Sequence, residues 1–216
     1  IVVGRVEVLA LFGEAGRQRV ARDLIVIIGM HRLTELEHDE VRHVDDVVDG
    51  ADAGTFEALT EADWADGYQK CLYSYTTAIC AALPYMKKGG GRIVNSTSSS
   101  IKQELDNLIL SNTFRMGVVG MSKTMAREFG PYNIMVNTMG PGRIYTDRIK
   151  HLNTIRAEKA GITLEEYNTR DAASFPQKRY QTADEYARSV VFICSPANSA
   201  ISGQVICVDG AMTTAY

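Results

Sequence analysis

The stretch Gly91-Arg92-Ile93-Val94-Asn95-Ser96-Thr97-Ser98 decides the fold class of this chain. Its centre is a short apolar run in which hydrophobic and polar residues do not alternate, with glycines before it and serines after it. A continuous β-branched run between such breakers is typical of a strand buried on both faces, and such strands occur mainly in parallel sheets. The stretch therefore predicts one strand of a parallel sheet, followed at its carboxyl end by a cluster of hydroxyl side chains.

Three further apolar runs have the same character and predict strands at residues 24–28, 133–137 and 204–208. Between the runs, apolar residues recur at steps of three and four, which indicates amphipathic helices. The predicted helices span residues 60–89, 114–129 and 182–195. This alternation of strand and helix predicts an α/β fold with a doubly wound, mostly parallel, Rossmann-like sheet.

The ends of two helices can be read from the sequence. Thr60 with Asp63 and Thr182 with Glu185 have the spacing of a capping box, in which two side chains satisfy free amides at a helix start. In the middle helix, Gly117 and Gly120 are expected to allow another backbone to approach closely.

The first 55 residues fit the pattern less well. Gly13 and Gly16 follow an apolar run without forming a G-x-G-x-x-G loop. The segment between Ile28 and Gly54 is shorter than the roughly 30 residues that a βαβ unit needs. We therefore expect a single domain over residues 1–216 with a shortened or irregular N-terminal part.

The composition excludes several classes of function. The formal net charge of −3 gives no basic footprint, so neither nucleic acid nor an anionic membrane is an expected partner. No apolar run approaches the roughly 20 residues that cross a bilayer, and the first residues do not resemble a signal peptide. The expectation is a cytoplasmic protein that acts on a small molecule.

Cysteines and histidines give no metal signature. His38 and His43 are five residues apart, a spacing that does not place both rings on one helix face, so no metal site is predicted. The cysteines contain no C-x-x-C pair and are expected to be small core residues. They are Cys71, Cys80, Cys194 and Cys207.

From about residue 56 to 210 the sequence resembles short-chain dehydrogenases/reductases of the 3-oxoacyl-carrier-protein reductase type. The resemblance is carried by short blocks that follow one another at the family's spacing: residues 61–64, 82–88, 91–98, 120–126, 133–137, 140–146 and 208–210. It implies an oxidoreductase that uses NADP or NAD to reduce a carbonyl or oxidise an alcohol, in homodimers or homotetramers.

The family's mechanism implies a serine that holds the substrate carbonyl, a tyrosine thirteen residues later as general acid/base, and a lysine four residues beyond the tyrosine. An asparagine on the preceding helix completes the set. Here Ser98 keeps the serine position, while Ser111, Arg115 and Cys71 stand at the tyrosine, lysine and asparagine positions. The surrounding residues resemble a branch of the family with the same replacements. Ser98, Ser111 and Arg115 are therefore the candidate catalytic residues.

These replacements change the acid/base chemistry. Residues 111 and 115 are four apart on a helix, so both are expected to face Ser98. An aliphatic hydroxyl is too weak an acid to replace a phenol near neutral pH, and arginine stays protonated, so it can stabilise an anion without relaying a proton. The proton must come from elsewhere, and the alternatives are water, Tyr73, Tyr75 and Lys102.

For the cofactor, the resemblance implies contacts to the nicotinamide and phosphates from the segment after the sixth strand of the family, here Pro141, Gly142, Ile144 and Thr146. Gly13 and Gly16 are the candidates for the pyrophosphate loop, although they are a poor substitute for the usual glycines. His31 and Arg32 favour NADP over NAD.

Two other functions remain open from the residues alone. Halohydrin dehalogenases have a similar fold with a halide site in place of the nucleotide, and Arg115 with the weak glycine loop fits them. A non-catalytic homologue kept for assembly or ligand sensing is the second alternative.

Overall fold

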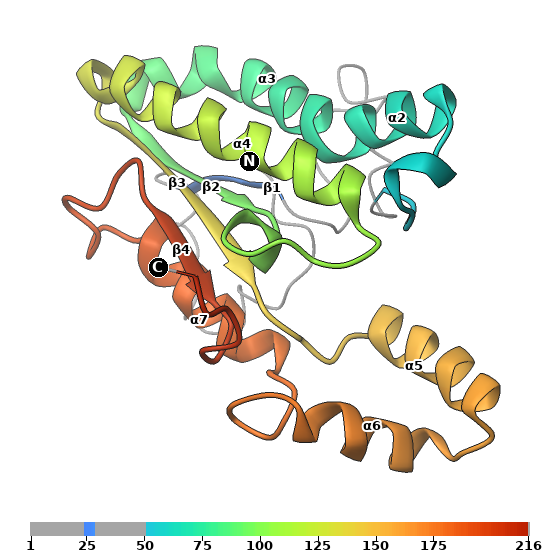
Figure 1. Ribbon diagram of the computed structural model, residues 1–216. Coiled ribbons are helices and arrows are strands. Elements are labelled where there is room, and N and C mark those ends of the chain that lie inside the picture. Colours follow the sequence, from blue (N-terminus) through green and yellow to red (C-terminus); the bar gives the residue numbers. More distant parts are fainter. Residues whose placement is uncertain (1–23, 29–50, 216) are drawn as a thin grey trace.

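The computed structural model describes residues 24–28 and 51–215 (Figure 1). Gly13 and Gly16 lie outside these residues, as do His31, Arg32 and both histidines of the 38–43 segment. The elements in chain order are strand β1 (Leu24–Ile28), 3-10 helix η3 (Phe56–Ala58), helix α2 (Glu61–Tyr68), π-helical turn η4 (Gln69–Tyr73), helix α3 (Ser74–Gly89), strand β2 (Gly91–Ser96), 3-10 helix η5 (Ser99–Ile101), helix α4 (Ile109–Glu128), 3-10 helix η6 (Gly130–Tyr132), strand β3 (Ile134–Pro141), helices α5 (Asp147–Ala160), α6 (Leu164–Ala173) and α7 (Ala183–Cys194), and strand β4 (Val205–Val208).

The described strands form one parallel sheet in the order β1-β2-β3-β4. Helices α3 and α4 cover one face of the sheet and α7 packs against the other (Figure 1). The four predicted strands are present. The third begins one residue later than expected and continues to Pro141. The prediction of a parallel sheet with helices on both faces is confirmed.

The core explains why the strand residues do not alternate between apolar and polar. Ile93 and Val94 are adjacent, so they point to opposite faces of β2, yet both are fully buried. Ile93 packs under α3 and α4 with Val118 and Val136, whereas Val94 packs with Val190 under α7. A strand with helices on both faces needs apolar side chains on both.

The capping boxes predicted at Thr60 and Thr182 are confirmed, whereas α4 begins at Ile109, before the predicted start at residue 114, and the first predicted helix is interrupted. Thr60 and Thr182 each form a capping box with the residue three positions on. The helix predicted over residues 60–89 contains a π-helical turn, η4, which inserts one extra residue into the helical repeat. Helix α4 starts with Leu108 as its N-cap, so Ser111 lies inside the helix.

Helices α5 and α6 form a pair beyond the carboxyl end of β3 (Figure 1). Buried polar groups join them: the Asn153 amide donates to Asn168 Oδ1 (2.8 Å) and to the Tyr180 phenol oxygen (2.9 Å). Tyr180 in turn donates to Asp171 Oδ2 over 2.5 Å. Burial and this carboxylate raise the pKa of Tyr180. The pair is therefore a small unit with its own internal contacts.

Two smaller expectations have mixed outcomes. Cys71 and Cys194 are buried, but Cys80 is exposed on α3, so the prediction of a core position is wrong for Cys80. A Cβ on Gly117 would lie 3.1 Å from the Leu72 side chain, as expected for close approach, whereas Gly120 has no atom within 4 Å. Among the described helices, none combines the length and the hydropathy that crossing a bilayer requires.

Candidate active site

The carboxyl end of β2 leads directly into the serine cluster. Both the amide and the hydroxyl of Thr97 donate to the Met139 carbonyl oxygen of β3, over 2.7 and 3.1 Å. Ser98 then begins η5, and its Oγ accepts the Ser100 amide over 3.2 Å. Ser98 thus lies where ligands bind in open α/β sheets, at the carboxyl edge of the strands.

Strand β3 ends against the backbone of Ser98. A Cβ on Gly140 would lie 2.7 Å from the Ser98 carbonyl oxygen, so only glycine fits there without moving the backbone. This close approach places the start of the Pro141–Thr146 segment beside the serine cluster, so Ser98 and Gly140, which are distant in sequence, share one edge of the sheet.

The Pro141–Thr146 segment is held by backbone contacts on both sides. The Gly142 amide donates to the Val208 carbonyl oxygen over 3.1 Å. Ile144 forms an isolated parallel bridge with Gln181, in which the flanking Arg143 carbonyl and Tyr145 amide make the two bonds, each 2.9 Å. In such a bridge the central residue's own amide and carbonyl point the other way. Ile144 therefore presents both backbone groups to the side away from Gln181.

Thr146, at the end of this segment, is the N-cap of α5. Its hydroxyl accepts the Ile149 amide over 3.4 Å, which still leaves the hydroxyl hydrogen available as a donor.

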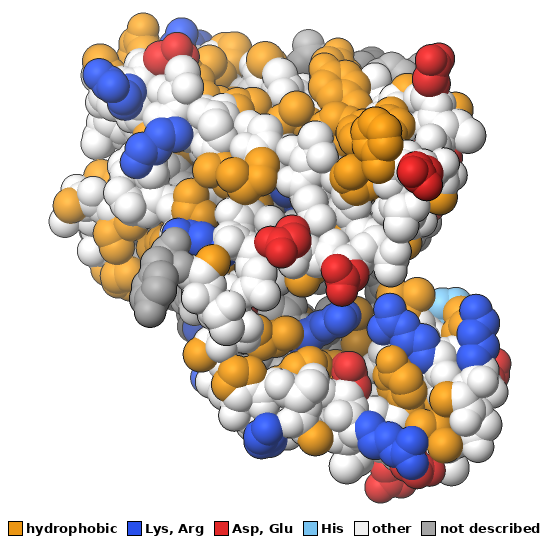
Figure 2. Space-filling model, in the orientation of Figure 1, with side chains coloured by type: hydrophobic (Ala, Val, Ile, Leu, Met, Phe, Trp, Pro, Cys, Tyr) orange, Lys and Arg blue, Asp and Glu red, His pale blue; other side chains and the backbone are white. Residues whose placement is uncertain are grey.

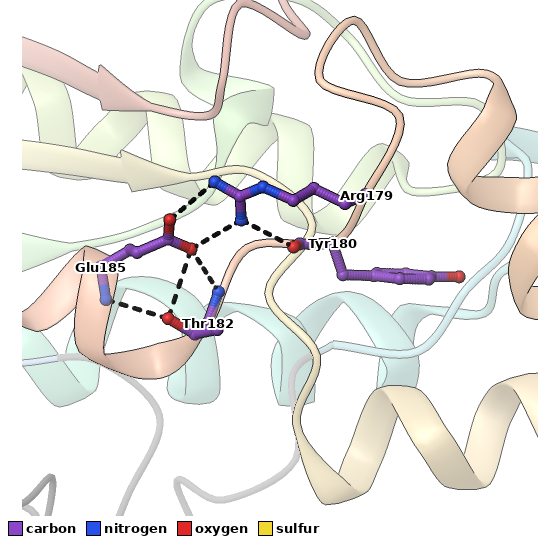
Figure 3. A network of polar contacts seen from close by, with 4 residues as sticks. All are labelled: Arg179, Tyr180, Thr182 and Glu185. Carbon is purple, nitrogen blue, oxygen red and sulfur yellow. Dashed lines mark hydrogen bonds and ion pairs between the residues drawn. The ribbon is translucent and has the colours of Figure 1, made fainter.

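The return from α6 is held to α7 by an ion pair (Figure 3). Arg179 binds the Glu185 carboxylate with two nitrogens, over 2.9 and 2.7 Å, and Thr182 donates its amide to the same carboxylate over 2.8 Å. The hydrogen bonds from Arg179, which have the largest effect, and from the Thr182 amide lower the pKa of Glu185 to about 2. Because Gln181 lies between Arg179 and Thr182, the network helps to fix the residue that forms the bridge with Ile144.

Arg115 is buried on α4, although arginine is seldom buried without partners. Its Nε donates to Ser111 Oγ over 3.0 Å, as the spacing of four residues predicts. Its Nη1 donates to the phenol oxygen of Tyr75 over 3.2 Å, a contact across to α3. The guanidinium therefore connects the two long helices.

Tyr75 connects the Arg115 guanidinium to the end of β2. Its hydroxyl donates to the Ser96 carbonyl oxygen over 2.6 Å, and Ser96 is the last residue of the strand. The phenol is only 2% exposed, and burial raises the pKa of Tyr75 while the Arg115 charge opposes the rise. From the opposite face of the sheet, Tyr186 shares a hydrogen bond of 2.6 Å with the Ser96 hydroxyl.

The structure thus joins Ser111 and Arg115 to each other and, through Tyr75, to the end of β2. The Ser98 hydroxyl accepts the Ser100 amide, and the grouping of Ser98 with Ser111 and Arg115 in one catalytic site stays a prediction. Tyr75 was only one of four alternatives for the proton donor. Tyr75 lies four residues after Cys71, which stands at the family's asparagine position. Residues four apart lie on the same face of a helix, so this spacing is the feature of the sequence that points to Tyr75.

The other protein groups considered as proton donors lie at the surface. Tyr73 is 45% exposed, and Lys102 is an exposed residue at the end of η5. Cys71 is buried against Leu110 in the π-helical turn. Within the part of the chain that the structure describes, no group of three or more metal-ligating side chains occurs.

Residues 43–213 match the family model described as enoyl-(acyl carrier protein) reductase. The chain belongs to the short-chain dehydrogenase/reductase family. Among curated relatives, the NADPH-dependent reductase BacG of Bacillus subtilis is 29% identical over 164 residues, which are 76% of this chain and 63% of BacG. The 3-oxoacyl-(acyl-carrier-protein) reductase of Vibrio cholerae is 33% identical over 157 residues, or 71% of this chain and 59% of that enzyme.

Solved structures agree with this family membership. YwfH, an NADPH-dependent reductase involved in bacilysin biosynthesis, superimposes with a TM-score of 0.71 at 28% identity, covering 78% of this chain and 65% of YwfH. L-sorbose reductase from Gluconobacter frateurii, solved with NADPH and L-sorbose, has a TM-score of 0.74 at 25% identity, covering 78% and 65%. The chain spans about three fifths of the length of the curated relatives named here.

Proposed function

We propose that this short-chain dehydrogenase/reductase is an NAD(P)-dependent oxidoreductase that reduces a carbonyl or oxidises an alcohol, with a non-standard acid/base set. The observation that carries the proposal is the meeting of the Pro141–Thr146 segment with the serine cluster at one edge of the sheet, through Gly140. Relatives with NADPH in their names or structures, such as BacG and L-sorbose reductase, support the choice of cofactor.

The residues present fit the nicotinamide end of the cofactor. Gly140 and Gly142 let this segment pack closely against the backbone of Ser98 and Asp209, and Ile144 turns its amide and carbonyl away from its bridge partner, as a carboxamide requires. Pro141 fixes the start of the turn, and the Thr146 hydroxyl retains a hydrogen to donate. The bound nicotinamide supplies or accepts the hydride. Gly13 and Gly16 remain proposed for the pyrophosphate.

The chain's own residues supply orientation and charge. Ser98 is proposed to donate a hydrogen bond to the substrate oxygen, as the family's serine does. The guanidinium of Arg115 stabilises the negative charge that develops nearby as the oxygen accepts electrons. Ser111, bonded to Arg115 Nε, holds the guanidinium in position.

We also propose that a single domain of this fold associates as a homodimer or homotetramer. Exposed aromatic and apolar side chains lie on the helices of one face, where Tyr68 is 39%, Tyr73 is 45% and Met116 is 49% exposed. Figure 2 shows hydrophobic side chains gathered over α2 and the start of α4. Apolar groups gathered in this way are typical of an interface.

The test of the proposed function is cofactor binding followed by turnover. Wild-type protein is expected to bind NADPH, with a Kd below about 100 μM and a Tm that rises with NADPH concentration. It is then expected to oxidise NADPH in the presence of benzaldehyde or ethyl acetoacetate. Arg115→Met should keep NADPH affinity and lose turnover, while Arg115→Lys keeps the charge and should retain part of it.

The opposite results are equally clear. If millimolar NADPH and NADH leave the Tm unchanged, the oxidoreductase proposal is wrong. Stabilisation by chloride in their place would support the dehalogenase alternative, because a halide would then occupy the crevice.

A further inference from the structure

The family's chemistry needs a phenol beside a fixed cation, because the positive charge stabilises the phenolate that remains after proton transfer. In this chain the cation is present at position 115, but position 111 carries an aliphatic hydroxyl. Helix α4 therefore carries the cation, Arg115, but no phenol at position 111 for this cation to stabilise.

A phenol reaches the same guanidinium from the neighbouring helix. Tyr75 extends from the start of α3, and its oxygen lies 3.2 Å from Arg115 Nη1. Arg115 Nε also donates to Ser111 Oγ over 3.0 Å, and residue 111 stands where the family has its tyrosine. One guanidinium therefore contacts both Ser111 and Tyr75.

The Tyr75 side chain is buried in the core between the sheet and the long helices, and its hydroxyl lies at the carboxyl end of β2. Its acceptor is the Ser96 carbonyl oxygen, 2.6 Å away, and Ser98 follows two residues later. The other nearby hydroxyl, that of Tyr186, approaches Ser96 from the opposite face through the serine side chain. The Tyr75 oxygen accepts a hydrogen bond from Arg115 Nη1.

We propose that Tyr75 is the general acid/base of this enzyme, so that the phenol has moved from α4 to α3 while the cation has stayed on α4. This inference rests on the proposed oxidoreductase function. In the reducing direction, the carbonyl carbon accepts a hydride from the reduced nicotinamide, and the C=O π electrons move onto the oxygen. The substrate oxygen first replaces the Ser96 carbonyl oxygen as the hydrogen-bond acceptor of the Tyr75 hydroxyl, and it then takes the proton of that hydroxyl. The resulting phenolate is stabilised by Arg115 and regains a proton from water; oxidation of an alcohol reverses these steps.

The test compares Tyr75→Phe with Tyr73→Phe, a matched loss of one hydroxyl two residues away at an exposed position. Tyr75→Phe is expected to bind NADPH with a Kd within threefold of wild type, equivalent to about 0.65 kcal/mol. Its turnover of benzaldehyde or ethyl acetoacetate should fall by about 100-fold to 10,000-fold, the usual contribution of general acid catalysis. Tyr73→Phe should match wild type in both.

A second measurement does not depend on turnover. In protein labelled at the tyrosine ring carbon that bears the oxygen, the signal missing from Tyr75→Phe identifies Tyr75. In the complex with NADP⁺, which cannot reduce a ketone, addition of ethyl acetoacetate should shift the Tyr75 signal and leave that of Tyr73 in place.

The outcomes separate the two proposals. Full turnover by Tyr75→Phe, or a ketone-induced shift confined to another tyrosine, overturns the role of Tyr75 and leaves the oxidoreductase proposal standing. Failure of the wild type to bind NADPH overturns the proposed function and this inference with it. NADPH binding without reduction of either carbonyl counts against both.

Discussion

At Gly142 the backbone of the proposed cofactor turn passes close to the end of β4. A Cβ at this position would lie 2.7 Å from the Asp209 Cα and 3.0 Å from the Asp209 carbonyl oxygen. Both are backbone atoms, so no side-chain rotation can relieve the clash. Asp209 is itself fixed, because its carboxylate accepts the amides of Ala211 and Thr213 over 3.0 and 2.9 Å.

Gly142→Ala is therefore expected to lower the free energy of unfolding by about 1–3 kcal/mol. The displaced turn should also weaken NADPH binding by about tenfold, equivalent to about 1.4 kcal/mol. Denaturant unfolding and NADPH fluorescence measure the two effects. Gly89→Ala is the control, since a Cβ there meets no atom within 4 Å. If Gly142→Ala behaves like this control, the turn does not hold the cofactor.

The candidate catalytic residues show what sequence can and cannot predict at this scale. The contact between Ser111 and Arg115 follows from helical spacing alone, and it is present. The Tyr75–Arg115 contact joins residues 40 positions apart, and its geometry depends on how α3 packs on α4. No local pattern encodes that packing, so the sequence could name Tyr75 only as one of several alternatives.

Among the elements, the two helix starts with a capping box were predicted well, whereas the start of α4 at Ile109 and the helix interiors were predicted less well. A capping box is a local feature of four residues, and both predicted boxes are present. The π-helical turn at Gln69–Tyr73 has no such marker, and the apolar repeat runs through it without an obvious break. Strand positions were predictable for another reason, because burial on both faces leaves a continuous apolar run.

The N-terminus of α7 makes a prediction about pH. Glu185 has its pKa lowered from 4.5 to about 2 by Arg179 and the Thr182 amide. As pH falls, the unfolded chain binds a proton at this carboxyl near pH 4.5, before the folded chain does. The stability that the carboxylate contributes is therefore complete above pH 4.5 and is lost between pH 4.5 and about 2.

Glu185→Gln is expected to have a lower Tm than wild type at neutral pH and a smaller further loss of Tm below pH 4.5. Thermal unfolding followed across this pH range measures the difference. Glu166→Gln is the control, because it removes an exposed ion pair with Arg170 within α6 and leaves the α7 start intact. A Glu185→Gln curve parallel to that of wild type would show that the carboxylate adds no pH-dependent stability.

For the molecule as a whole, the proposed association depends on which helical surface stays uncovered. Gly117 is approached by Leu72 within the chain, whereas Gly120 has no neighbour within 4 Å. Gly120 and the exposed Met116 lie on the same side of α4, at a spacing of four residues. This combination of a small residue and an apolar one lets a second helix approach closely and gain apolar contact.

Met116→Lys is expected to shift wild-type homodimers or homotetramers toward smaller species in sedimentation velocity, because an ammonium group buried in the contact lacks a partner. Ile155→Lys makes the same change in charge at a 36% exposed position on α5, away from α3 and α4, and should leave the assembly unchanged. Equal dissociation by both variants would point to a general effect of charge. A wild-type protein that sediments as a monomer at micromolar concentration would contradict the proposed association outright, because the apolar face of α4 would then be exposed in solution without a partner copy.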